Sequence, residues 1–196
     1  MSSVLVFGDQ EKMGDRKKDD FYPTPWEATE APLLAEKQWL DQYDEVDEPA
    51  CGDGAMAEVI RSHGKTVHAS DLVYRGYGEG GVDFLNLNAK PKSKVMFTNP
   101  PFNEAESFIR LANERGYEYI GMILKVNYFN TQGRIPLFNK YRPVRVYPYS
   151  WRIDFTGDGN NHFDCNFVVW MPEFQGKTEY CCPLEKPKVM AQPQLF

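Results

Sequence analysis

Residues 94–102 read KVMFTNPPF, a short apolar run that ends at Thr98 and is followed by Asn99, two prolines and an aromatic ring. Proline fixes φ and has no backbone N–H, so the predicted strand cannot continue through Pro100 and Pro101. Each proline also restricts the residue before it to extended geometry. The stretch therefore predicts a buried strand that ends in a rigid loop. That loop carries one amide side chain, free carbonyl groups and a ring.

Segments typical of strands alternate with segments typical of helices along the rest of the chain. Strands are predicted over 45–50, 66–70, 82–85, 94–98, 119–126, 144–149 and 166–170, and helices over 26–39, 55–62, 104–115 and 131–141. Such alternation indicates an α/β fold with a mostly parallel sheet. We expect one domain over 21–174, a charged lead-in over 1–20 and a proline-containing tail over 175–196.

Composition excludes several classes of protein. The 196 residues are 42% hydrophobic, which suits a folded core, and the longest apolar runs are too short to span a bilayer. The N-terminus has no signal-peptide pattern, and the four cysteines lack disulfide spacing, so a cytoplasmic location is expected. His162 and the cysteines around it fit no zinc-finger spacing, so no metal site is predicted.

Charge is distributed unevenly along the chain. The net charge is −6, and the first fifty residues hold thirteen Asp and Glu against five Lys and Arg, whereas residues 119–153 hold no acid. A basic stretch rich in aromatic residues is typical of a nucleic-acid-binding surface. The cations predicted to contact nucleic acid are Lys125, Arg134, Lys140, Arg142, Arg145 and Arg152. The alternative is that the aromatic residues form core strands and the cations extend from strand ends into water.

Two further strand ends carry polar chemistry, and ligands of open α/β sheets bind at such ends. The first is the loop 48–54, EPACGDG, in which glycines permit close approach of a ligand to the backbone. It has neither the GxGxxG pattern nor a following lysine, so it does not suit a phosphate. Glu48 can hold an ammonium group, and Asp71, at the next strand end, can accept hydrogen bonds from ribose hydroxyls.

Asp83 and Phe84 follow as a carboxylate beside a ring. This pair suits an adenine, since the carboxylate can accept from the exocyclic amine while the ring packs on the base. Sites for an ammonium, a ribose and an adenine, with none for a phosphate, indicate S-adenosylmethionine rather than NAD or ATP.

With these motifs in this order, the chain resembles the class I S-adenosylmethionine-dependent amino methyltransferases, in particular the DNA adenine-N6 enzymes. Loop 48–54, Asp71 and the pair 83–84 resemble the first three motifs of that family, and residues 99–102, NPPF, resemble its catalytic motif. An element over 21–25, FYPTP, is similar to the family motif that precedes the first. The resemblance covers residues 21 to about 130. It implies a Rossmann-like fold with a seven-stranded sheet and helices on both faces, in an enzyme as compact as those that phages encode.

The resemblance also implies roles for individual residues. The implied cofactor-binding residues are Phe21, Thr24, Glu48, Ala50, Cys51, Gly52, Gly54, Asp71, Leu72, Asp83, Phe84 and Asn99. The implied catalytic residues are Asn99, Pro100, Pro101 and Phe102. The Asn99 amide oxygen and the Pro100 carbonyl would accept the two hydrogens of the target amine, and Phe102 would stack on a base rotated out of the helix. Ala50 stands where the family has an aromatic residue.

Several alternatives remain open at this point. The NPPF sequence also occurs in RNA adenine methyltransferases, which are the nearest alternative class. A protein glutamine methyltransferase is disfavoured by Phe102, because that class has tyrosine there, and by the basic stretch. A non-catalytic accessory module that binds S-adenosylmethionine is disfavoured by the intact Asn99. Residues 151–155, WRIDF, either reach over the target base or form an edge strand.

Overall fold

The computed structural model describes residues 23–86, 88, 90–157, 159 and 163–189. In chain order its elements are α1 (Trp26–Ala35), α2 (Lys37–Leu40), β1 (Glu45–Glu48), α3 (Ala55–Ser62), β2 (Thr66–Asp71), β3 (Glu79–Gly80), β4 (Val95–Thr98), α4 (Ala105–Glu114), β5 (Tyr119–Lys125), the 3₁₀ helices η2 (Val126–Phe129) and η3 (Gln132–Arg134), α5 (Ile135–Lys140), β6 (Arg145–Pro148), β7 (Cys165–Trp170) and β8 (Glu179–Tyr180). The predicted cofactor contact Phe21 and the predicted lead-in lie outside the described residues.

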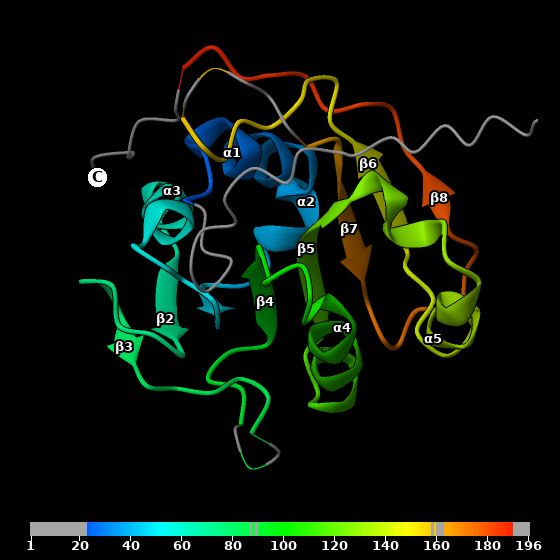
Figure 1. Cartoon of the computed structure of the whole chain (residues 1–196), viewed down its shortest axis with the longest axis horizontal. Coiled ribbons are helices and arrows are strands. Elements are labelled where there is room, and N and C mark those ends of the chain that lie inside the picture. Colours follow the sequence, from blue (N-terminus) through cyan, green and yellow to red (C-terminus); the bar gives the residue numbers. More distant parts are fainter. Residues whose placement is uncertain (1–22, 87, 89, 158, 160–162, 190–196) are drawn as a thin grey trace, which may run out of the picture.

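The strands form one sheet in the order β3-β2-β1-β4-β5-β7-β6-β8 (Figure 1). Strand β7 runs antiparallel to both of its neighbours, and the other pairings are parallel. The predicted α/β fold with a mostly parallel sheet is thus confirmed. The sheet has eight strands rather than seven, because β8, from the predicted tail, pairs with β6. Leu184 in the same tail is buried and bridges to Tyr149.

Alternating side chains place a hydrophobic core on each face of the sheet. On β4, Val95 and Phe97 pack with α1 and α3, whereas Met96 packs with α4 on the opposite face. Helices α1 to α3 therefore cover one face and α4 and α5 cover the other (Figure 1). No helix in the described part of the chain is long and apolar enough to cross a membrane.

Two predicted elements differ from the structure. The helix predicted over 26–39 is divided into α1 and α2 at Glu36, whose side chain is fully buried. The strand predicted over 82–85 is a turn, in which the Asp83 carboxylate accepts a hydrogen bond from the Leu85 N–H at 2.8 Å. The strand in that part of the chain is β3, which lies three residues earlier than predicted.

A buried ion pair joins the α1–α2 junction to the sheet. Arg145 of β6 donates to both oxygens of Glu36, at 2.6 and 2.7 Å, and the Tyr147 hydroxyl also donates to Glu36 at 2.6 Å. The guanidinium lies 4.9 Å from the ring centre of Trp39. Both charged groups are almost completely buried, so each depends on the other to offset the loss of water.

Replacing Arg145 with Met should destabilise the fold strongly, because it leaves the Glu36 carboxylate buried without its partner. We expect the free energy of unfolding to fall by about 3–5 kcal/mol. Urea denaturation followed by circular dichroism measures the change. Arg152→Met is the matched control, since the Arg152–Asp164 pair is exposed and its loss should cost less than about 1 kcal/mol. Equal, small effects of both substitutions would contradict a structural role for the buried pair.

Candidate active site

Polar residues at the ends of β1, β2 and β4 line one pocket. These strands are parallel neighbours, so their carboxyl ends meet at the same edge of the sheet. The pocket is lined by Pro23, Thr24, Glu48, Ala50, Cys51, Gly52, Asp53, Ala55, Met56, Asp71, Arg75, Asn99, Pro100, Pro101 and Phe102. The structure therefore brings together the predicted loop 48–54, Asp71, the predicted NPPF motif and Thr24.

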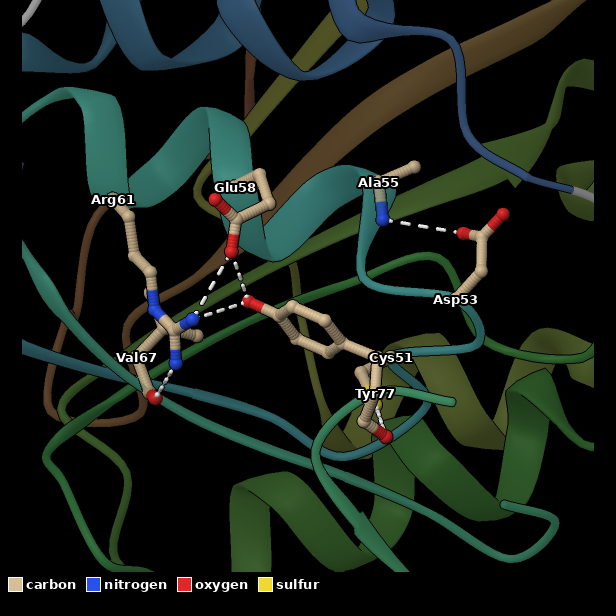
Figure 2. Close-up of polar contacts among 7 residues, drawn as sticks. All are labelled: Cys51, Asp53, Ala55, Glu58, Arg61, Val67 and Tyr77. Atoms are coloured by element: carbon tan, nitrogen blue, oxygen red, sulfur yellow. Dashed lines mark hydrogen bonds and ion pairs between the residues drawn. The ribbon is translucent and has the colours of Figure 1, made fainter. Parts of the chain in front are cut away.

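The turn between β1 and α3 depends on glycine. Gly54 has φ of +90°, and a Cβ there would lie 2.4 Å from atoms of the Tyr77 ring. Figure 2 shows the contacts that hold this ring: the Tyr77 hydroxyl lies between Glu58 and Arg61 of α3. It donates to Glu58 at 2.6 Å and accepts from Arg61 at 2.5 Å. The loop after β2 is thereby held over the turn after β1.

Asp71 connects these two loops from inside the pocket. Its carboxylate accepts hydrogen bonds from the Gly52 N–H at 2.9 Å and the Val73 N–H at 2.8 Å. Arg75, which the sequence analysis did not identify, donates to the same carboxylate at 3.1 Å. A carboxylate has about four acceptor positions. Asp71 can therefore still accept from a ligand.

Glu48 is the most unusual carboxyl group of the pocket. Its side chain is 2% exposed, and its Oε2 atom has no hydrogen-bond partner among the residues described. Burial, reinforced by the nearby Asp71 and Asp53, raises its pKa to about 8. A buried acceptor with a raised pKa favours either a proton or a cationic ligand. The geometry therefore suits the ammonium that the sequence predicted for this position.

Asn99, on the pocket lining, carries a second buried acceptor. Its Nδ2 donates to the Thr24 hydroxyl at 3.1 Å, and its Oδ1 is buried without a hydrogen-bond partner in the described chain. The following Pro100 and Pro101 have no N–H that could satisfy this oxygen. The site thus holds two buried oxygens, on Glu48 and Asn99, that lack donors. Buried polar atoms are normally paired, so unpaired ones at a pocket indicate a ligand with matching donors.

Phe102 forms the aromatic side of the pocket. Its ring centre lies 5.7 Å from that of Phe163 and 6.1 Å from that of Phe155. The ammonium of Lys125, at the end of β5, lies 4.2 Å from the Phe102 ring centre and 4.1 Å from that of Phe163. A positive charge is therefore held beside the ring that is predicted to stack on the target.

Four predicted cofactor contacts among the described residues do not lie on the pocket lining: Gly54, Leu72, Asp83 and Phe84. Asp83 is an exposed turn residue, and Phe84 is buried against Phe108 at 4.5 Å and under the Arg115 guanidinium at 4.5 Å. The expectation that the Phe84 ring is available to an adenine is therefore wrong, because α4 occupies its face. Leu72 is 62% exposed directly after Asp71, and its contact with the cofactor stays a prediction.

The basic stretch is less available to a polyanion than its composition suggested. Arg145 is wrong as a phosphate contact, because it is buried and paired with Glu36. Lys140 is paired with Glu114, and Arg152 with Asp164, at exposed positions. Arg134 lies with its guanidinium 3.8 Å from the Tyr128 ring centre and donates to the Tyr128 carbonyl at 2.9 Å, and Arg142 is exposed. None of residues 151–155 is on the pocket lining, and Ile153 and Phe155 are buried in the core.

Other chemistries find little support in the pocket. Burial, with smaller effects from Glu48 and Asp71, raises the pKa of the Cys51 thiol to about 12, so it is not a thiolate nucleophile near neutrality. No group of three or more metal-ligating side chains occurs within the described ranges. The carboxylates of Glu48, Asp53 and Asp71 line the pocket with Arg75 as the cation, which disfavours a phosphate ligand.

No protein-family model and no curated protein matches the chain. Solved structures share its fold. A candidate RNA methyltransferase of Pyrococcus horikoshii aligns with a TM-score of 0.61 and 12% identity over 82% of this chain and 92% of that chain. A candidate class I S-adenosylmethionine-dependent methyltransferase of Listeria monocytogenes aligns with a TM-score of 0.60 and 12% identity over 82% of this chain and 65% of that one.

A candidate hemolysin of Lactococcus lactis also aligns, with a TM-score of 0.55 and 7% identity over 80% of this chain and 92% of that chain. At such identities the likeness concerns the fold alone. It confirms the predicted Rossmann-like fold of the class I methyltransferases.

Replacing Glu48 with Gln should stabilise the ligand-free protein at pH 7.5 and have little effect at pH 5. The pKa of Glu48 is raised from 4.5 to about 8, so the wild type loses stability as pH rises between these values, whereas glutamine does not titrate. We expect a gain on the order of 2 kcal/mol at pH 7.5, measured by urea denaturation at both pH values. The exposed Glu173→Gln is the control. A gain of the same size at both pH values would exclude a buried carboxyl as its cause.

Proposed function

We propose that this chain transfers a methyl group from S-adenosylmethionine to the exocyclic N6 amine of adenine in DNA. The observation that carries the proposal is the unpaired, buried Oδ1 of Asn99, held at the edge of a pocket that also contains the unpaired Glu48 carboxyl. An amine donor satisfies the first atom, and the ammonium of the cofactor satisfies the second.

The residues present fit this cofactor at several points. Glu48 would hold its ammonium, Asp71 would accept from its ribose hydroxyls, and Gly52, with φ of 56°, allows close approach to the backbone. The charged side chains of the lining are three carboxyl groups and one guanidinium, which suits a ligand that carries positive charge and no phosphate. When bound, S-adenosylmethionine would supply a methyl group activated by its sulfonium.

The chain's own contribution is to position the amine. The Asn99 Oδ1 and the Pro100 carbonyl would accept the two amine hydrogens, which draws the nitrogen lone pair out of conjugation with the ring. S-adenosylmethionine would supply the methyl carbon and keep the electron pair of the carbon–sulfur bond on its sulfur, and the methylated amine would lose one proton to solvent. Positioning and desolvation supply most of the rate, since a strong base is not needed before attack.

The proposed nucleic-acid contacts follow from the cations that the structure leaves at the surface. Lys125 is held beside Phe102, the ring proposed to stack on the extruded base. Arg134 and Arg142 are the proposed phosphate contacts farther along the chain.

RNA is the second candidate substrate. The solved structure from P. horikoshii, a candidate RNA methyltransferase, has the same fold over most of its length. The amine-binding geometry would be the same for an adenine in either polymer, so the two differ in contacts to the backbone and the 2′-hydroxyl. A non-catalytic accessory module that binds S-adenosylmethionine is the third candidate.

The substrate can be identified by incubating the chain with labelled S-adenosylmethionine and duplex DNA, single-stranded DNA, RNA or protein. We expect label in DNA, recovered as N6-methyladenine after digestion to nucleosides. Label in RNA alone would replace the proposal with the second candidate. Retained S-adenosylmethionine binding without transfer to any of the four substrates would favour the accessory module, and N4-methylcytosine would correct the target base.

Substitutions of Asn99 and Asp71 should affect methyl transfer and cofactor binding separately. Asn99→Ala is expected to lower kcat by at least about a hundredfold, because it removes the acceptor that activates the amine, and to leave the Kd for S-adenosylhomocysteine nearly unchanged. Asp71→Ala is expected to raise that Kd by about tenfold or more, since it removes a charged hydrogen-bond acceptor. Titration calorimetry and steady-state kinetics measure the two effects.

The exposed Asn103→Ala is the matched control for Asn99, being an amide four residues farther along the chain. Equal losses of cofactor affinity in Asn99→Ala and Asp71→Ala would contradict the separate roles.

A further inference from the structure

A side-chain hydrogen bond joins the described residues before α1 to the loop after β4. The Asn99 Nδ2 donates to the Thr24 Oγ1 at 3.1 Å, although 75 residues separate the two in sequence. Thr24 is 7% exposed and lies on the pocket lining. Neither the sequence motifs nor the fold comparison assigns this contact.

We propose that Thr24 is a positioning residue that holds the Asn99 amide with its oxygen directed into the pocket. The inference rests on the proposed function, in which this oxygen accepts a hydrogen from the target amine. It differs from the role predicted for Thr24 from the sequence, which was contact with the cofactor. Thr24 here acts on the reaction through Asn99.

The chemistry of the amide explains why a partner is needed. A side-chain amide has an acceptor at one end and a donor at the other. If Oδ1 is to meet an amine, Nδ2 must point the opposite way, into a buried environment, and it needs an acceptor there. The Thr24 hydroxyl supplies that acceptor. If the amide were reversed, its N–H₂ would face the donor hydrogens of the amine, and no hydrogen bond could form.

Both ends of this hydrogen bond lie in rigid backbone. Thr24 is flanked by Pro23 and Pro25, and Asn99 is followed by Pro100. A following proline restricts each of the two residues to extended geometry. Pro25 also serves as the N-cap of α1, with φ of −55°, and thereby ties the segment to a helix packed on the sheet. The hydrogen bond thus joins two stiff segments, which suits a group that has to be held in one orientation.

Substitution of Thr24 tests the role, with Thr24→Val as the main variant. Valine keeps the shape of threonine and removes the acceptor, so Nδ2 is left buried without a partner. We therefore expect kcat to fall roughly 10- to 100-fold, which corresponds to about 1.4–2.8 kcal/mol. The Kd for S-adenosylhomocysteine and the KM for nucleic acid should stay within about twofold of wild type. Thr24→Ser, which restores the hydroxyl, should recover most of the kcat.

Thr29→Val is a matched control from the same region. Thr29 is a fully buried threonine of α1, and its hydroxyl has no hydrogen-bond partner among the described residues. The substitution is identical in chemistry and similar in burial, so it reports any general effect of replacing threonine by valine. It should leave kcat unchanged.

Three results would overturn the inference: wild-type kcat in Thr24→Val, no recovery in Thr24→Ser, or a loss of cofactor affinity in Thr24→Val as large as its loss of kcat. The third result would return Thr24 to a cofactor-binding role. Each requires an active wild type, so the failure of the proposed function is recognised separately, as the absence of transfer by the unmodified chain.

The hydrogen bond can also be tested without activity. The side-chain NH₂ signals of Asn99 are identified in a ¹⁵N–¹H spectrum as the pair that Asn99→Ala removes. Thr24→Val should shift or broaden this pair, and Thr24→Ser should keep it near its wild-type position. Unchanged signals in Thr24→Val would overturn the positioning role, whatever the chain methylates.

Discussion

The parallel pairing of β1 with β2 and with β4 is the constraint on which the site depends. Parallel strands end at the same edge, so residues that follow β1, β2 and β4 become neighbours although the sequence separates them widely. The hydrogen bond from the Gly52 N–H to Asp71 then fixes the first two loops against each other, and Tyr77 holds the second over the first. Loss of this register would disperse the pocket.

Two sets of buried polar groups in the molecule differ in whether they have hydrogen-bond partners. Glu36 and Arg145 are buried and fully paired, so their desolvation is offset inside the fold. Glu48 and Asn99 are buried with oxygens that lack donors among the described residues, so a ligand with donors could compensate their desolvation. The Glu36–Arg145 pair stabilises the fold. The unpaired oxygens of Glu48 and Asn99 lower its stability, and hydrogen-bond donors of a bound ligand can restore that stability.

Sequence predicted the strand-end loops well because their signals are local. Glycine, proline and a polar residue after an apolar run specify a turn at a strand end wherever the strand lies, and the parallel sheet brings these turns together. Phe84 was misplaced because nothing local shows that α4 covers its ring. The basic stretch was overestimated for a similar reason: Glu36, Glu114 and Asp164 lie outside the acid-free segment and pair with its cations across the fold. Composition gives the number of charged residues, but it does not show which of their side chains form ion pairs in the folded chain.

Under the proposed function, catalysis has to rely on geometry, because the pocket has few groups suited to proton transfer. Asn99 does not titrate, the Cys51 thiol is protonated near neutrality, and Glu48 would be engaged by the ammonium of the cofactor. What the chain can control is the position of one amide oxygen and one carbonyl relative to the reacting carbon, where an error of 1 Å costs about a hundredfold in rate. Prolines lie on both sides of the Thr24–Asn99 hydrogen bond, and the end of β4 is buried between two cores. Under the proposed function, these features fix the positions of the groups on which catalysis depends. In this view the stiffness of the NPPF loop matters as much as its hydrogen-bonding groups.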